Sequence, residues 1–180
     1  MNYLKYLTGG DFRSLADSRL LIKYIKSQDE FNELIAMLSH PDDIVRMRAA
    51  DVIEKITAGN KDYLTSHKTA IIAQCKCEMR KEIKWHYALL LSRLPLTRKE
   101  AGVVWERLSE WVSDRAESRI VRVNSLQALF EIQTHFPELA NDFNLLLLTI
   151  ESENIPSLSA RIRKLKTIRK GRRISKLNLK

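Results

Sequence analysis

The sequence predicts an all-α fold. Only five Gly and four Pro occur among its 180 residues, and 44% of the residues are hydrophobic, which is enough for a buried core in one domain of ordinary size. No alternation of apolar and polar residues persists along the chain, and the helix-favouring residues Leu, Ala, Lys, Arg and Glu are abundant. A segment of similar sequence recurs every 38 residues, which also indicates a stack of similar helical units.

The returning segment has the pattern of an amphipathic helix. Its three clear copies are IVRMRAADVIEKI (44–56), EIKWHYALLLSRL (82–94) and IVRVNSLQALFEI (120–132). In each copy the aliphatic residues recur at helical spacing and trace one stripe, which the helix is expected to bury. A weaker fourth copy, ARIRKLKTI (160–168), belongs to an apolar stripe that predicts a last helix over 157–170, and Gly171 is expected to end this helix.

Another helix is predicted before each copy, so that each copy is the second helix of a hairpin. The four first helices carry apolar residues at helical spacing and cover residues 29–39, 62–76, 99–113 and 138–152. The turn residues agree with this division, because Pro41 and the two acids after it can start a helix, and Gly59 can end one. The remaining prolines fall at helix junctions and never inside a predicted helix: Pro95, Pro137 and Pro156.

The second helix of the first hairpin reads V-R-x-x-A-A-x-V-I from Val45 to Ile53, after an acidic Pro-Asp-Asp turn. This helix pair of about 38 residues resembles a HEAT repeat. The resemblance covers roughly residues 29–170 and is clearest in the first and third copies. It implies a short right-handed α-α superhelix, an armadillo-like α-solenoid of about four HEAT-like hairpins with an N-terminal capping helix.

The expected organisation is an N-terminal cap over residues 1–28, a repeat domain over 29–170 and a basic C-terminal tail over 171–180. Within the repeat domain the hairpins cover approximately residues 29–60, 61–97, 98–136 and 137–170. Each hairpin of such an array buries its apolar face against its neighbours, which leaves long surfaces for other molecules. The resemblance therefore implies a non-catalytic scaffold that binds a protein partner.

The resemblance also assigns expected roles to residues that align across the copies. Arg46, Lys84 and Arg122 occupy the position from which HEAT families commonly tie one repeat to an acid of the next, and we favour this role over a phosphate-binding ladder. The x positions are expected to line the concave surface as a partner-binding ridge: Met47, Arg48, Trp85, His86, Leu89, Val123, Asn124 and Gln127. The alternative for Trp85 is packing between repeats, since large aromatic side chains are more often buried.

The positive charge of the chain is concentrated at its C-terminal end. The formal net charge is +9, yet residues 1–153 hold 21 basic and 22 acidic residues, whereas residues 154–180 hold ten basic residues and no acid. The basic segment could bind nucleic-acid backbone, an anionic membrane surface or an acidic protein, or it could serve only for solubility. It contains no aromatic residues, which argues against stacking on nucleic-acid bases. The candidate cations for binding nucleic-acid backbone are Arg161, Arg163, Lys164, Lys166, Arg169, Lys170, Arg172, Arg173 and Lys176.

The sequence offers little catalytic or metal-binding chemistry. Cys75 and Cys77 point about 200° apart on a helix and cannot bind one metal ion together, and the four His residues are scattered. No phosphate-binding loop or nucleophile elbow occurs, so we expect no enzyme activity, no metal and no cofactor. A HEAT-like DNA glycosylase is a minor alternative, because Trp111, Asp114 and Arg115 superficially resemble the site of such enzymes.

Three features bear on the cellular location. No apolar run approaches the roughly 18 residues that a membrane span needs, and the N-terminus carries no evident export signal. The two cysteines do not form a disulfide framework. We therefore expect a cytoplasmic protein, and its oligomeric state stays open.

Overall fold

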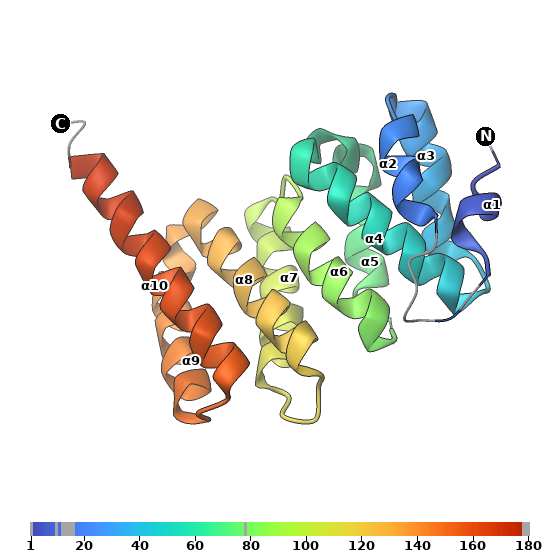
Figure 1. Cartoon of the computed structure of the whole chain (residues 1–180). Coiled ribbons are helices and arrows are strands. Elements are labelled where there is room, and N and C mark those ends of the chain that lie inside the picture. Colours follow the sequence, from blue (N-terminus) through green and yellow to red (C-terminus); the bar gives the residue numbers. More distant parts are fainter. Residues whose placement is uncertain (1, 10, 12–16, 78, 178–180) are drawn as a thin grey trace. The chain divides into compact units, whose positions relative to one another are not determined.

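The computed structural model describes residues 2–9, 11, 17–77 and 79–177, without the side chains of residues 172–177, and all its regular elements in these ranges are helices (Figure 1). The α-helices are α1 (Leu4–Leu7), α2 (Leu21–Tyr24), α3 (Gln28–Ala36), α4 (Asp43–Gly59), α5 (Lys68–Gln74), α6 (Lys81–Arg93), α7 (Arg98–Ser113), α8 (Arg119–His135), α9 (Ala140–Ser152) and α10 (Pro156–Leu177). Short 3-10 helices connect them: η1 (Ser18–Leu20), η2 (Met37–Ser39), η3 (Lys61–His67) and η4 (Pro137–Leu139). The predicted all-α fold is confirmed.

The chain forms two compact units, Met1–Pro95 and Leu96–Lys180. In the N-terminal unit, α4 packs against α3, α6 and the short helices of the cap. Its core contains side chains with no exposed area, among them Phe31, Val52, Ile53, Leu90 and Leu91. In the C-terminal unit, α8 packs against α7, α9 and α10, around Val104, Leu108, Leu126, Leu129 and Phe143. Within each unit the second helices of successive hairpins therefore lie side by side, α4 with α6 and α8 with α10.

Side-chain caps define where several helices begin. Ser27 and Thr97 each form a capping box with the Glu three residues later, at the starts of α3 and α7. Asp42 accepts a hydrogen bond from the backbone N–H of Ile44 and starts α4, as the Pro-Asp-Asp turn predicts. These caps satisfy backbone donors that the first helical turn leaves without partners.

The last helix is longer than predicted. Gly171 was expected to end it, but α10 continues through Gly171 to Leu177, so the predicted helix end is wrong. A Gly inside a helix costs only about 1 kcal/mol relative to Ala, and the residues on both sides of Gly171 are mostly good helix formers. The predicted capping helix is also divided, because the described part of the cap contains the short helices α1, η1 and α2.

Candidate functional site

Three residues of the predicted partner-binding ridge are buried, and the prediction that they face a partner surface is wrong for them: Met47, Arg48 and His86. The N-terminal cap covers this part of α4. The guanidinium of Arg48 donates hydrogen bonds to the backbone carbonyls of Leu7, at 2.9 Å, and Thr8, at 2.8 Å. The repeat pattern describes each helix by itself and does not show which neighbouring element covers it.

The other five ridge residues are half-buried. Trp85 and Leu89 lie one helical turn apart on α6 in the N-terminal unit, and the centroid of the Trp85 ring is 3.4 Å from that of the His86 ring. Val123, Asn124 and Gln127 lie on α8 in the C-terminal unit. The side chains that remain accessible therefore give one candidate surface on each unit.

On the C-terminal unit, Gln127 connects two helices. Its amide oxygen accepts a hydrogen bond from Nη1 of Arg161 on α10, at 2.7 Å, and its amide nitrogen donates to Oε1 of Glu131, at 2.8 Å. Burial lowers the pKa of Arg161. The accessible side chains of α8 and α10 are thus in direct contact, through Gln127 and Arg161.

The cations of α10 fall into two groups. Lys166 forms an ion pair with Glu151, and Arg169 donates to the amide oxygen of Asn144, so these two face α9. The exposed cations without a partner among the described residues are Arg163, Lys164 and Lys170. The side chains of three further predicted cations lie outside the described residues: Arg172, Arg173 and Lys176.

The aligned cation of the third copy has the predicted structural role. Arg122 is buried, and its guanidinium binds both carboxylate oxygens of Glu153, at 2.9 and 2.8 Å, while its Nε donates to the carbonyl of Val112. In the first copy, Arg46 pairs with Asp43 of its own helix start. The interpretation as a repeat-to-repeat tie is therefore confirmed for Arg122.

The residues that suggested a glycosylase do not converge. Trp111 is buried in the core of the C-terminal unit. Asp114 is the C-terminal capping residue of α7 and is exposed, as is Arg115. This arrangement places the aromatic ring and the carboxylate in different surroundings, so it does not support the glycosylase alternative.

A pocket of about 640 Å³ lies beside α4, α5 and α6. Its charged lining is internally paired, because both Arg46 and Arg80 form ion pairs with Asp43. Residue 78, which is next to its lining residue Met79, lies outside the described residues. The pocket does not include the cluster of ionisable side chains described next.

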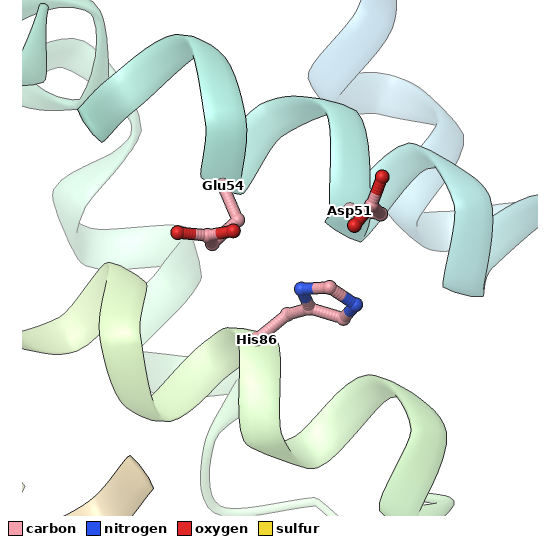
Figure 2. Close-up of side chains that lie close together, drawn as sticks. All are labelled: Asp51, Glu54 and His86. Carbon is pink, nitrogen blue, oxygen red and sulfur yellow. The ribbon is translucent and has the colours of Figure 1, made fainter. Parts of the chain in front are cut away.

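Two carboxylates and an imidazole are buried together between α4 and α6 in the N-terminal unit (Figure 2). Asp51, Glu54 and His86 are only 3%, 4% and 2% exposed, and one potential ligand atom of each lies within 4.8 Å of the other two. Asp51 and Glu54 are three residues apart and share one face of α4. His86 rises from α6, and its ring lies between the two carboxylates. Among the described residues, this is the one group of at least three His, Cys, Asp or Glu side chains that lie close enough together to hold a metal ion.

The two carboxylates have different electrostatic surroundings. Burial tends to raise the pKa of Glu54, but hydrogen bonds from Lys55 and Arg93 outweigh this effect and hold the pKa below its usual value. Burial raises the pKa of Asp51. The charges of Lys55 and Arg19 oppose this effect without outweighing it, and Nε of Arg19 is 3.6 Å from Oδ2 of Asp51. Glu54 is thus the better compensated of the two acids.

His86 is held in its neutral form. Burial lowers the pKa of its imidazole to about 3. Its Nδ1 atom is buried and has no hydrogen-bond partner among the described residues, and the same is true of Oδ2 of Asp51. A buried polar atom without a partner costs about 1–3 kcal/mol. The cluster therefore contains an imidazole nitrogen and a carboxylate oxygen that have no hydrogen-bond partner among the described residues.

Sequence reasoning missed this cluster, because it assigned His86 to an exposed ridge and treated the four His residues as scattered. The spacing of Asp51 and Glu54 places two acids on one helical face, and this is the signal that the sequence contains. The meeting with His86 depends on how α6 lies against α4. A 38-residue repeat does not define that contact.

The comparisons with known proteins agree with the fold. None of the described helices is both long enough and apolar enough to cross a membrane. Searches of curated proteins and of solved structures returned no significant match. A family model described as a HEAT repeat domain matches residues 13–168, which is most of the chain. The chain therefore belongs to the HEAT repeat domain family.

Proposed function

We propose that the chain is a non-catalytic repeat scaffold that binds a protein partner through the second helices of its hairpins. HEAT repeat domains are repeat scaffolds that commonly mediate protein interactions, which supports this class of function. The observation that carries the proposal is the hydrogen bond between Arg161 and Gln127, because it joins the accessible side chains of α8 to the cationic helix α10.

The proposed contact surface on the C-terminal unit is the α8–α10 ridge, formed by Val123, Asn124, Gln127, Arg161 and Lys164. Val123 provides apolar area, Asn124 and Gln127 provide amide groups, and the two α10 residues provide positive charge. Lys164 follows Arg161 by three residues, so the two lie next to each other on the helix surface. A surface of this composition is complementary to an acidic protein segment that also carries an apolar side chain.

The charge of α10 supports the same partner class. Residues 156–177 contain nine basic residues and no acid. The neighbouring acid Glu151 is already paired with Lys166, which leaves Lys164 available. On the N-terminal unit the corresponding candidates are Trp85 and Leu89, since a half-buried aromatic ring is a common interface anchor.

The proposal can be tested with a fluorescently labelled acidic peptide of Glu, Asp and Leu residues, titrated with the full chain and followed by anisotropy. Lys164→Glu is the test variant, and Lys99→Glu on α7 is its control, because both residues are exposed and both changes alter the net charge equally. We expect Lys164→Glu to weaken binding about tenfold, equivalent to about 1.4 kcal/mol. The control should stay within about twofold of the unmodified chain.

The alternative function, binding of nucleic-acid backbone, predicts a different result. Single-stranded and duplex oligonucleotides would then bind more tightly than the peptide, and the logarithm of the affinity would fall steeply with that of the salt concentration. Arg163→Glu and Lys170→Glu would weaken that binding about as much as Lys164→Glu, because backbone contacts depend on charge more than on position. Tighter oligonucleotide binding, or equal effects of Lys164→Glu and Lys99→Glu on the peptide, would contradict the proposal.

A further inference from the structure

We propose that Asp51, Glu54 and His86 form a binding site for a divalent transition-metal ion, with Zn²⁺ as the best match, between α4 and α6. The site lies in the N-terminal unit and is independent of the α8–α10 ridge. All three residues are at least nine-tenths buried, and their potential ligand atoms lie within 4.8 Å of one another. Figure 2 shows the imidazole between the two carboxylates.

The donor set points to Zn²⁺ rather than to Mg²⁺ or Ca²⁺. One imidazole nitrogen and two carboxylate oxygens suit a borderline metal, whereas Mg²⁺ and Ca²⁺ prefer oxygen ligands alone. Zinc binds such atoms at about 2.0–2.2 Å, so tetrahedral ligand atoms lie about 3.4 Å apart. The ligand atoms lie at most 4.8 Å apart, so each pair must approach by no more than about 1.4 Å to reach that value, which is within the range of side-chain rotation. Water can occupy the fourth position.

Unsatisfied atoms distinguish this cluster from ordinary packing of polar side chains. Nδ1 of His86 and Oδ2 of Asp51 are both buried without a hydrogen-bond partner among the described residues. Both atoms are metal ligands by type, and a bound cation would satisfy both at once.

The charges around the site permit a dication. The two carboxylates together balance its charge. The cations now next to them are on long, exposed side chains, since Arg19 is 59% and Lys55 41% exposed. Both can turn into solvent and release Oδ2 of Asp51 and Oε2 of Glu54 for the metal.

Arg93 would stay and hold one ligand in place. Its Nη1 donates to the backbone carbonyl of Glu54 and to Oγ1 of Thr57, at 2.5 and 2.9 Å, and its Nη2 donates to Oε1 of Glu54, at 2.7 Å. These bonds leave the second carboxylate oxygen of Glu54 free to bind the ion. Hydrogen bonds that orient a ligating carboxylate in this way are common around protein metal sites.

The competing explanation for the unpartnered buried atoms is that Asp51 is protonated and no metal ion binds. A protonated Asp51 would carry no buried charge and, after a side-chain rotation, would have an O–H to donate to the imidazole of His86, without any ion. This explanation predicts no specific affinity for Zn²⁺, so a binding experiment separates the two.

The experiment uses the full chain and Zn²⁺ alone, in competition with a chromogenic chelator. We expect one ion per chain, with at least about 100-fold weaker binding for Asp51→Asn and for His86→Gln. His67→Gln is the control, because His67 is a half-buried imidazole of the same unit that bonds to Asn32 and lies outside the cluster. It should bind zinc as the unmodified chain does, and so should a variant with both cysteines changed to Ser, which removes thiolate binding.

A second measurement needs no substitution and holds even if a variant fails to fold. In the ¹⁵N-labelled unmodified chain, Zn²⁺ should shift one ring nitrogen of His86 strongly and leave the ring of His67 unchanged. The fluorescence of Trp85 should change in parallel, because its ring lies against His86. Absence of one-to-one binding, retention of full affinity in His86→Gln, loss of affinity in the cysteine-free variant, or an unchanged His86 ring would each overturn the proposal.

Discussion

The ion pair between Arg122 and Glu153 should be one of the main stabilising contacts of the C-terminal unit. Arg122 is 1% and Glu153 6% exposed, and two hydrogen bonds join their charged groups. Glu153→Gln removes the charge and keeps the size of the side chain. It leaves a buried guanidinium without a counter-ion, although Arg122 keeps its bond to the carbonyl of Val112.

The expected loss of unfolding free energy is about 3 kcal/mol. Removing one member of a buried pair typically costs about 3–5 kcal/mol, and the lower end applies here because the Gln amide oxygen can still accept one hydrogen bond. Glu153 also lies 3.8 Å from Arg115, whose side chain is 78% exposed. Arg115→Met should therefore cost less than about 1 kcal/mol, as solvent-exposed pairs do.

Urea unfolding followed by tryptophan fluorescence measures these values, since Trp105 and Trp111 both belong to the C-terminal unit. A double-mutant cycle with Arg122→Met isolates the pair. The double variant should be no less stable than Glu153→Gln alone, because replacing both members removes the unpaired buried charge. A cost for Glu153→Gln as small as that for Arg115→Met, or strictly additive single effects, would refute the reasoning.

Two further predictions concern the N-terminal unit. Arg48→Met should lower the stability by about 2 kcal/mol and speed hydrogen exchange in α1, because it removes the donor to the carbonyls of Leu7 and Thr8, whereas Arg98→Met at an exposed site should do neither. Backbone N–H groups before α3 hold the pKa of Glu30 below its usual value. The stability that Glu30 contributes to the fold is therefore present above the unfolded-state pKa and is lost as pH falls through the folded-state pKa. Urea midpoints measured from pH 6 to 3 should therefore fall less in Glu30→Gln than in the unmodified chain.

The helices could be predicted because their signals are local. The three clear copies became α4, α6 and α8, with bounds close to the predicted ones, since a buried stripe and a cap are written in the residues of each helix. The end of α10 could not be predicted in the same way. A single Gly is compatible both with a helix end and with a helix interior, and its neighbours decide between them.

The site was less predictable than the fold. Trp85 and Gln127 are accessible enough to remain on candidate surfaces, but His86 is not. The sequence places Asp51 and Glu54 on one face of a helix. It does not say that this face is covered by α6, because coverage depends on the packing of side chains from two hairpins.

One position of the repeat explains why part of the predicted ridge is internal. Arg48 and His86 are equivalent residues, 38 positions apart, on α4 and α6. Each is buried against the element that precedes its own hairpin. Arg48 meets backbone carbonyls of the cap, and His86 meets the acids of α4. In these two copies the side chain therefore matches the chemistry of the preceding element, as a donor for carbonyl oxygens at Arg48 and as an imidazole beside carboxylates at His86. In these two copies the position is internal, whereas its third occupant, Asn124, is half-buried and stays on the α8–α10 ridge.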